Sequence, residues 1–127
     1  MKRDMDLVRT LLLKIEAGKK QTMSHLVNAP CRIGDPEDIG YHLRMLIKEA
    51  GLVTGIDVRT CDGDDWIHLE LTWFGHEFLD DIRDPEIWRR TKEGAASIGS
   101  FSIDTLRELA KGFVKHKLHQ HTGILIN

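Results

Sequence analysis

One stretch decides the fold of this chain: residues 35–73, which read DPEDIGYHLRMLIKEAGLVTGIDVRTCDGDDWIHLELTW. Asp35 precedes a proline and two more acids, a pattern typical of a helix start, and apolar residues follow at helical spacing until Gly51. Two β-rich runs come next, residues 52–60 and 66–73. The CDGDD segment between them holds an Asp-Gly pair, which favours a tight turn. The stretch therefore predicts a helix followed by a two-stranded hairpin.

The residues before this stretch predict one helix and one extended segment. Apolar residues spaced three and four apart predict an amphipathic helix over about residues 3–17, which Gly18 ends. Residues 23–33 include Pro30 and show no helical period, so we expect a short strand or an irregular extended segment there.

The residues after it predict three helices. A short helix runs from Phe74 to about Ile82, and the Asp-Pro-Glu motif at 84–86 begins a second one, which gives way to a small and flexible stretch at 94–100. Ser102 is a suitable cap for a final amphipathic helix, and we expect the tail after His121 to be loose.

Composition describes an ordinary soluble protein. The chain has 127 residues, 41% of them hydrophobic and 30% charged, with a formal net charge of -2. We expect a single compact domain overall, and the near-zero charge argues against a strongly basic nucleic-acid binder. No apolar run approaches the length of a membrane span or a signal-peptide core, so we expect a cytoplasmic protein and no membrane partner. Its two cysteines show no disulfide pattern, and reduced thiols are expected.

The order of helix, extended segment, helix and hairpin is that of a winged helix-turn-helix domain. Two stretches resemble bacterial winged-helix regulators: YHLRMLIKEAGLVTG at 41–55, and the leucine-threonine-x-x-glycine motif at 71–75. We therefore predict an α+β fold with a winged-helix-like core at 1–84 and a C-terminal helical extension at 85–127. A complete helix-turn-helix needs a separate helix before the recognition helix; residues 21–34 imply that this helix is missing or very short.

Over nearly its full length the chain resembles a family of bacterial and prophage proteins, the domain of unknown function 2513 family. The resemblance rests on MKRDMDLVR, YHLRMLIKEAGL, LTWFGHEFLDDIRDPEIW and the last amphipathic helix. It implies an intracellular protein with a winged-helix-like core. A family without an assigned activity implies no catalytic residues.

The small net charge is a cancellation between segments. Residues 1–34 carry +4, residues 35–86 carry -10 and residues 87–127 carry +4. The acidic middle contains the predicted recognition helix and wing, where a DNA-binding domain needs cations to neutralise phosphates. This distribution disfavours the face that such a fold ordinarily presents to DNA.

The candidate nucleic-acid contacts are the few cations near that face and those at the chain's start. They are Arg44, Lys48, Arg59, Lys2, Arg3 and Arg9. Further cations at the two ends could add to a basic face if the ends pack together: Lys19, Lys20, Arg89, Arg90, Lys92, Lys111, Lys115 and Lys117. For each of them, an ordinary solvated surface charge is the competing interpretation.

No pattern in the chain predicts catalysis, a cofactor or a metal site. His116, His119 and His121 lack further ligands nearby, and Cys31, Cys61, His25 and His68 lack zinc-ligand spacing. His76 and Glu77 are neighbours that point in different directions on a helix. The three tryptophans, Trp66, Trp73 and Trp88, are expected in the core or an interface.

Two functional hypotheses remain open from the sequence. The first is a non-enzymatic regulator that binds double-stranded DNA. The second is a protein-interaction module that presents its acidic helix and wing to a basic protein partner. A homodimer through the last helix is also expected, because that helix has an apolar face with no evident second layer.

Overall fold

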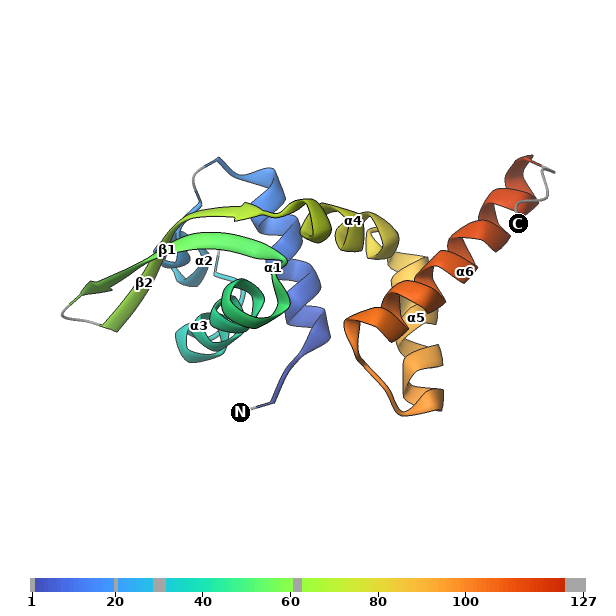
Figure 1. The fold of residues 1–127 in the computed structure, drawn as a ribbon, viewed down its shortest axis with the longest axis horizontal. Coiled ribbons are helices and arrows are strands. Elements are labelled where there is room, and N and C mark those ends of the chain that lie inside the picture. Colours follow the sequence, from blue (N-terminus) through green and yellow to red (C-terminus); the bar gives the residue numbers. More distant parts are fainter. Residues whose placement is uncertain (1, 20, 29–31, 61–62, 123–127) are drawn as a thin grey trace. The chain divides into compact units, whose positions relative to one another are not determined.

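The structure, a computed structural model, describes residues 2–19, 21–28, 32–60 and 63–122 and has the predicted α+β composition (Figure 1). The described residues form six helices and one two-stranded antiparallel sheet. The chain divides into two compact units, Met1–Glu77 (unit 1) and Phe78–Asn127 (unit 2). This division lies inside a helix, earlier in the chain than the boundary at 84/85 that the sequence predicted.

Unit 1 begins with helix α1, Met5–Ala17. The Asp4 carboxylate caps it by accepting hydrogen bonds from the backbone N–H groups of Asp6 and Leu7. Its apolar stripe is buried, as the spacing predicted, and forms one wall of the core. The other walls come from the second and third helices and from the hairpin, through Leu26, Ile39, Leu43, Leu46, Leu52, Val53, Trp66 and Leu69.

Helix α2, Met23–Val27, corrects the prediction of an extended segment over 23–33. It is a single short turn of helix capped by the Thr22 hydroxyl, and Leu26 is its only buried residue. A helix this short shows no repeating apolar period, which is why the sequence pattern missed it. An extended element does occur just before it, where Gln21 forms an antiparallel bridge with Leu69.

Helix α3, Pro36–Met45, starts where the Asp-Pro motif predicted. Asp35 occupies the N-cap position, but its carboxylate makes no capping hydrogen bond and instead pairs with Arg32 at 3.2 Å. The helix continues as a π-helical turn, η1, Leu46–Ala50. Gly51 ends it with a left-handed φ of 69°, as its position in the sequence predicted.

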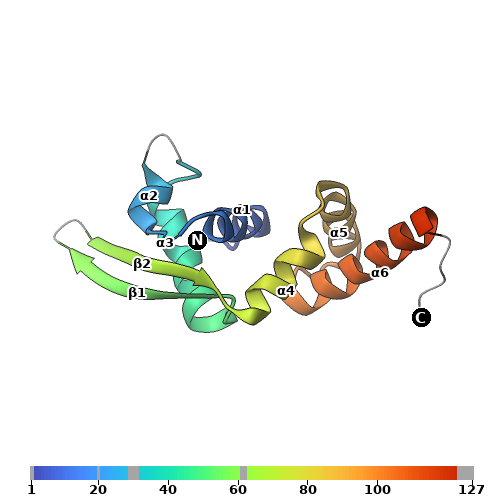
Figure 2. The ribbon, with the colours of Figure 1, turned by 90° about the horizontal axis from the view of Figure 1, so that it is seen from above.

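The hairpin consists of β1, Val53–Thr60, and β2, Gly63–Leu71 (Figure 2). The predicted turn at 61–65 is shorter than expected, because β2 already begins at Gly63, while Cys61 and Asp62 lie outside the described residues. A β-bulge interrupts the ladder: Thr54 pairs with Glu70 and Ile56 with Ile67, so two residues of β2 face Gly55 alone. One of these two, His68, has a positive φ of 53°.

Three helices follow the hairpin, as predicted: α4, Trp73–Ile82; α5, Pro85–Ile98; and α6, Ile103–Thr122. Helix α5 does not give way at Gly94 but continues to Ile98, and the missing side chain of Gly94 leaves room for Leu109 of α6. The buried residues of unit 2 come from all three helices: Phe78, Leu79 and Ile82 of α4, Ile87, Trp88, Thr91 and Ala95 of α5, and Leu106 and Ala110 of α6. Ser102 caps α6 through the N–H of Thr105, as predicted. The predicted loose tail falls largely on 123–127, outside the described residues.

The leucine-threonine-x-x-glycine motif joins the hairpin to α4. The Thr72 hydroxyl donates to the carbonyl of Gly51 at 2.6 Å and accepts from the N–H of Gly75 at 3.0 Å. A Cβ atom on Gly75 would overlap the carbonyl oxygen of Leu52. Position 75 therefore admits only glycine without a shift of the backbone.

We expect Gly75→Ala to lower the free energy of unfolding by about 1–3 kcal/mol, because the added methyl group meets rigid backbone. Gly112→Ala is the matched control, since a Cβ there meets nothing within 4 Å and helix propensity should raise stability by about 0.5–1 kcal/mol. Urea denaturation followed by circular dichroism measures both. Equal stabilities of the Gly75→Ala variant and the wild type would contradict the close approach.

Candidate nucleic-acid interface

A buried histidine connects α3 to the start of α1. His42 is 1% exposed, and its Nε2 atom accepts a hydrogen bond from the backbone N–H of Asp4 at 2.8 Å. Its Nδ1 atom lies 2.7 Å from the carbonyl oxygen of Asp38. A backbone N–H can only donate and a carbonyl can only accept, so the imidazole is neutral with its proton on Nδ1.

This contact places the first cations of the chain beside α3. Lys2 and Arg3 are exposed and directly precede Asp4, whose backbone is bonded to His42. The predicted candidates at the chain's start are thereby brought close to α3. Arg9, a turn further along α1, is only half-exposed.

The exposed side of α3 carries two of the predicted candidates. Arg44 and Lys48 are both exposed, and Tyr41 lies half-buried one turn before Arg44, with its ring edge-on to His42. On the opposite side of the helix, Ile39 and Leu43 are buried in the core. Within the described residues neither Arg44 nor Lys48 forms an ion pair, so both cations face solvent.

Tyr41 and His42 were not among the residues that the sequence singled out. His42 occupies the buried face defined by Ile39, Leu43 and Leu46, and that spacing was the available indication that its side chain is inside. Nothing in the sequence indicated Asp4 as its partner, because the two are 38 residues apart.

Acidic side chains lie near the same helix. Glu37 and Glu49 are exposed on α3 and η1, and Asp57 is exposed on β1. Asp65 has a structural role: its carboxylate accepts from the N–H of Ser24 at 3.2 Å and from the Ser24 hydroxyl at 3.0 Å, which ties β2 to α2. Part of the acidity of the hairpin is thus explained by packing.

Arg59, the candidate in the predicted wing, occupies a β1 position paired with Asp64 in the backbone register. The structure does not describe its side chain.

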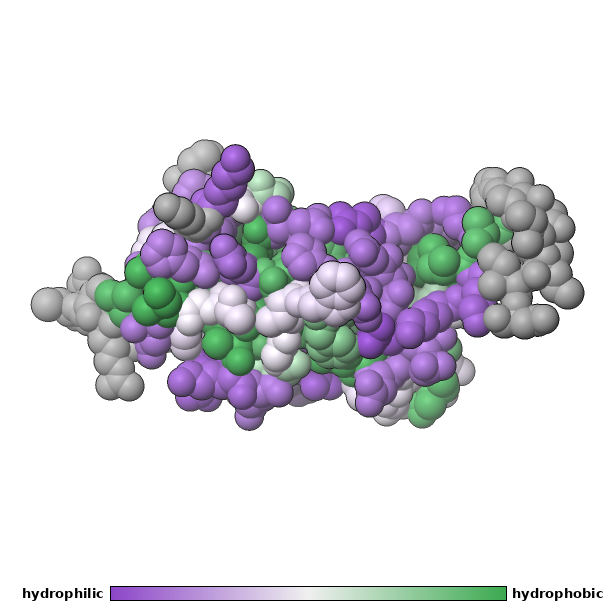
Figure 3. All heavy atoms as spheres, turned by 45° about the horizontal axis from the view of Figure 1, so that its top comes forward, coloured by the Kyte–Doolittle hydropathy of each residue, from purple (hydrophilic) through white to green (hydrophobic). Residues whose placement is uncertain are grey.

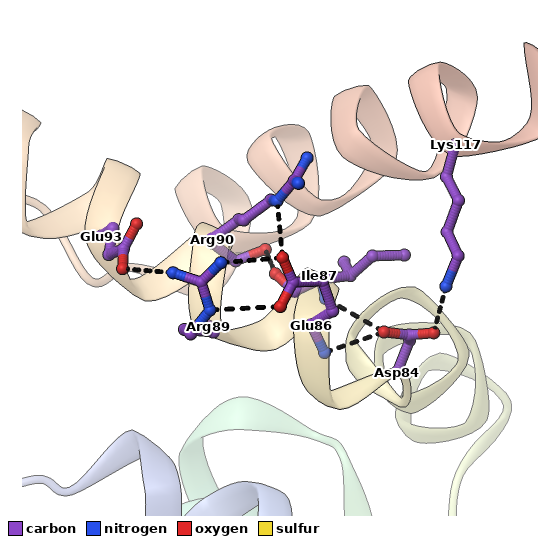
Figure 4. A network of polar contacts seen from close by, with 8 residues as sticks. Asp84, Glu86, Ile87, Arg89, Arg90, Glu93 and Lys117 are labelled. Atoms are coloured by element: carbon purple, nitrogen blue, oxygen red, sulfur yellow. Dashed lines mark hydrogen bonds and ion pairs between the residues drawn. The ribbon is translucent and has the colours of Figure 1, made fainter. Parts of the chain in front are cut away.

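The cations of unit 2 are largely held in ion pairs with carboxylates of the same unit (Figure 4). Arg89 contacts Glu86 and Glu93, each at 2.7 Å, and Arg90 contacts Glu86 at 3.0 Å. Lys117 lies 2.5 Å from Asp84, the residue that caps α5. Of the cations considered for a basic face from the sequence, Arg89 and Arg90 therefore pair with carboxylates of their own helix, and Lys117 joins α6 to the start of α5.

These ion pairs shift the ionisation of their partners. The hydrogen bond from Lys117, followed by the N–H of Ile87, holds the pKa of Asp84 below its ordinary value of 3.8. Hydrogen bonds from Arg89 and then Arg90 lower the pKa of Glu86, and Glu86 in turn raises the pKa of Arg89.

His76 and Glu77 are adjacent in the sequence but contact different residues. Nδ1 of His76 lies 3.8 Å from a carboxylate oxygen of Glu16, whereas Glu77 accepts a hydrogen bond from the Trp73 indole at 2.8 Å. Trp66 and Trp88 are buried in the core, one of the two places expected for the tryptophans, whereas Trp73 is 81% exposed and lies outside the core.

Among the described residues, no group of three His, Cys, Asp or Glu side chains is arranged to hold a metal ion. Cys31 and Cys61, which entered one candidate metal set, lie outside the described residues, as do the side chains of His119 and His121. No helix in the part of the chain that the structure describes has the length and apolar character of a membrane span.

Comparison with known proteins agrees with the resemblance predicted from the sequence. The family described as a hypothetical protein (DUF2513) matches residues 2–102. The chain belongs to the DUF2513 family. The family match covers unit 1, α4 and α5 and ends directly before α6. A protein from Haemophilus influenzae, named only as an uncharacterized protein, is 34% identical over 119 residues, which cover 93% of this chain and 99% of that one. No solved structure matches.

Replacing His42 tests the junction between α1 and α3. We expect His42→Ala to lower the free energy of unfolding by about 2–4 kcal/mol, because it leaves a cavity and removes the partner of the Asp4 N–H. His25→Ala, at an exposed position, is the control and should change stability by less than about 0.5 kcal/mol. Urea denaturation monitored by tryptophan fluorescence gives both values; similar losses in the two variants would contradict the anchoring role.

Acidification tests the Asp84 pair. Because the folded-state pKa of Asp84 is lowered, the stability it contributes is complete above its ordinary pKa of 3.8 and is lost as the pH falls through the lower folded value. We expect the wild type to lose stability in this range more steeply than Asp84→Asn, with Lys117→Met in between. Urea denaturation at a series of pH values provides the measurement, and parallel curves for wild type and Asp84→Asn would exclude the linkage.

Proposed function

We propose that unit 1 is a winged-helix DNA-binding domain and that the chain is a non-enzymatic, regulator-like factor. The observation that carries this proposal is the exposed side of α3, where Arg44 and Lys48 face solvent without ion-pair partners among the described residues. Arginine and lysine presented on a helix are the groups that contact phosphates and base edges in a groove.

The order of elements supports this proposal. Helix α1, the bridge at Gln21, α2, α3 and the hairpin follow one another as the helices and strands of a winged helix do. The short α2 stands where the first helix of a helix-turn-helix is expected, and α3 stands where the recognition helix is expected. The bridge between Gln21 and Leu69 supplies the small third strand.

The start of the chain brings two further cations close to α3. The hydrogen bond between Asp4 and His42 holds Lys2 and Arg3 beside α3. An N-terminal basic arm next to a recognition helix can follow the DNA backbone while the helix occupies the major groove. Lys2, Arg3, Arg44 and Lys48 are thus the four cations assigned to phosphate or base contacts, and Arg59 on the wing is a fifth candidate.

The electrostatics limit how strongly this surface binds. Unit 1 holds ten Lys and Arg residues against thirteen Asp and Glu residues, a net charge of -3. Binding therefore depends on local placement of a few cations and not on the field of the whole unit. Four phosphate contacts correspond to a slope of about -3 to -4 in log K against log salt.

Fluorescence anisotropy with a labelled duplex at several salt concentrations tests the proposal. We expect Arg44→Ala and Lys48→Ala each to weaken binding about fivefold at low salt and to reduce the salt slope by about 1. Lys19→Ala is the control: this exposed residue follows the far end of α1, about 20 Å along the helix from the Asp4 contact. Absence of binding at low salt, or equal losses in all three variants, would overturn the proposal.

A second candidate is a protein-interaction module for a basic protein partner. It is favoured by the exposed acids Glu37, Glu49 and Asp57 together with exposed apolar side chains on β1, where Ile56 is 54% and Val58 is 36% exposed. Apolar residues on a strand with acidic neighbours suit a protein partner better than a phosphate backbone. The same titration separates the two candidates, because this one predicts no duplex binding even at low salt.

A further inference from the structure

Helix α6 carries a stripe of exposed residues on the side away from α5. We call Phe101, Asp104, Glu108, Lys111, Lys115 and Leu118 the outer stripe; Phe101 lies just before the helix begins, and all six are exposed. The five residues within the helix, from Asp104 to Leu118, are spaced alternately four and three residues apart, which aligns them along one side of α6. Leu106 and Ala110, which are buried, lie on the other side.

The order of chemical types in the outer stripe is complementary to its own reverse, because acids and bases exchange places when it is read from the other end. It begins with an apolar residue, continues with two acids and two bases, and ends with an apolar residue. The spacing is the same when counted from either end. A second copy of the stripe, laid antiparallel, therefore places Asp104 opposite Lys115 of the second copy and Glu108 opposite Lys111 of the second copy. A parallel arrangement places like charges together and is disfavoured.

The four charged residues of the outer stripe are available for such contacts. Among the described residues, no ion pair engages Asp104, Glu108, Lys111 or Lys115. Lys117, on the side of α6 towards α5, differs because it is bonded to Asp84. The structure thus separates the cations of α6 that hold unit 2 together from those that remain at the surface.

Apolar side chains at both ends of the stripe complete the match. Phe101 is 39% exposed and Leu118 is 42% exposed, and the same antiparallel register brings them together. Val114, 36% exposed, lies one turn before Leu118 and extends the apolar area. Figure 3 shows apolar spheres among hydrophilic ones next to the grey C-terminal residues. Covering these side chains removes apolar surface from water.

We propose that two copies of the chain associate through the outer stripe of α6 in an antiparallel arrangement. Each dimer contains four ion pairs, because the two-fold symmetry repeats every contact, and two contacts between Phe101 and Leu118 of the other copy. The interface belongs to unit 2 and does not depend on the proposed DNA binding by unit 1. Since its ion pairs join side chains at the protein surface, the association weakens as salt is added.

Charge-reversal variants of the full chain test whether the charges of the outer stripe act between two copies of the chain or only within their own helix. Acids near the start and bases near the end of a helix also complement its dipole, so a single reversal alone would not decide. We expect Glu108→Lys and Lys111→Glu each to raise the dissociation constant of the dimer about tenfold or more, because each converts two attractions per dimer into two repulsions.

Combining the reversals gives the decisive measurement. An equimolar mixture of the Glu108→Lys and Lys111→Glu proteins should form a heterodimer, and the double variant E108K/K111E should dimerise as the wild type does, because both restore opposite charges across the interface. Asp57→Lys, the same change of charge on an exposed residue of unit 1, is the control and should leave the dimer intact.

Light scattering and sedimentation equilibrium at low and high salt measure the masses, and circular dichroism verifies that each variant is helical. A wild type that stays monomeric at tens of micromolar at low salt would overturn the proposal. So would single variants that dimerise like the wild type, or a mixture that fails to recover the dimer.

Discussion

The buried imidazole of His42 is the interaction on which the arrangement of unit 1 depends. Its Nε2 atom accepts from the backbone N–H of Asp4, a donor at the start of α1 that has no partner within that helix, and its Nδ1 atom bonds the carbonyl of Asp38 within α3. The bond to Asp4 fixes α3 against the start of α1 and brings the first cations of the chain close to α3. An apolar residue at position 42 could fill the space but could not make either bond, so packing alone would not hold the two helices in this relation.

Ion pairs account for part of the uneven distribution of charge along the sequence. Counted along the sequence, residues 35–86 are strongly acidic, but several of these acids have partners outside that segment. Asp81 is bonded to Arg107 and Asp84 to Lys117, both on α6, while Glu86 is bonded to Arg89 and Arg90 on α5. Part of the acidic middle and part of the basic C-terminal segment are therefore halves of the same contacts. The charge that bears on the proposed DNA binding is that of unit 1, in which acidic residues outnumber basic ones only slightly.

The sequence predicted most elements with long periodic patterns and missed those decided by a single contact. Helix α1, α3, the hairpin and α6 follow from apolar spacing, caps and turns, and the glycine at 51 marked the end of its helix. Helix α2 has one buried residue and no period, so no pattern could show it. The predicted end of α5 at Gly94 was wrong: the helix continues to Ile98, and a contact with Leu109 gives that glycine a packing role.

The candidate site was partly predictable for the same reason. Arg44 and Lys48 could be placed on the exposed side of a helix from spacing alone, and both are exposed. The position of Lys2 and Arg3 beside that helix depends on a hydrogen bond between residues 38 apart, which no local pattern records. Asp65 is one of the acids of the predicted wing, and its bonds to Ser24 make it a link between β2 and α2.

The β-bulge in the hairpin determines how β2 would respond to the deletion of one residue. Trp66 and Leu69 are both buried although they are three residues apart, an odd separation that would put them on opposite faces of a regular strand. His68 is the extra residue that makes this possible. Deleting His68 would leave Leu69 opposite Gly55 and every buried side chain of β2 on its present face, while removing the bend that a bulge imposes. One residue thus sets the direction of the hairpin tip without contributing to the core beneath it.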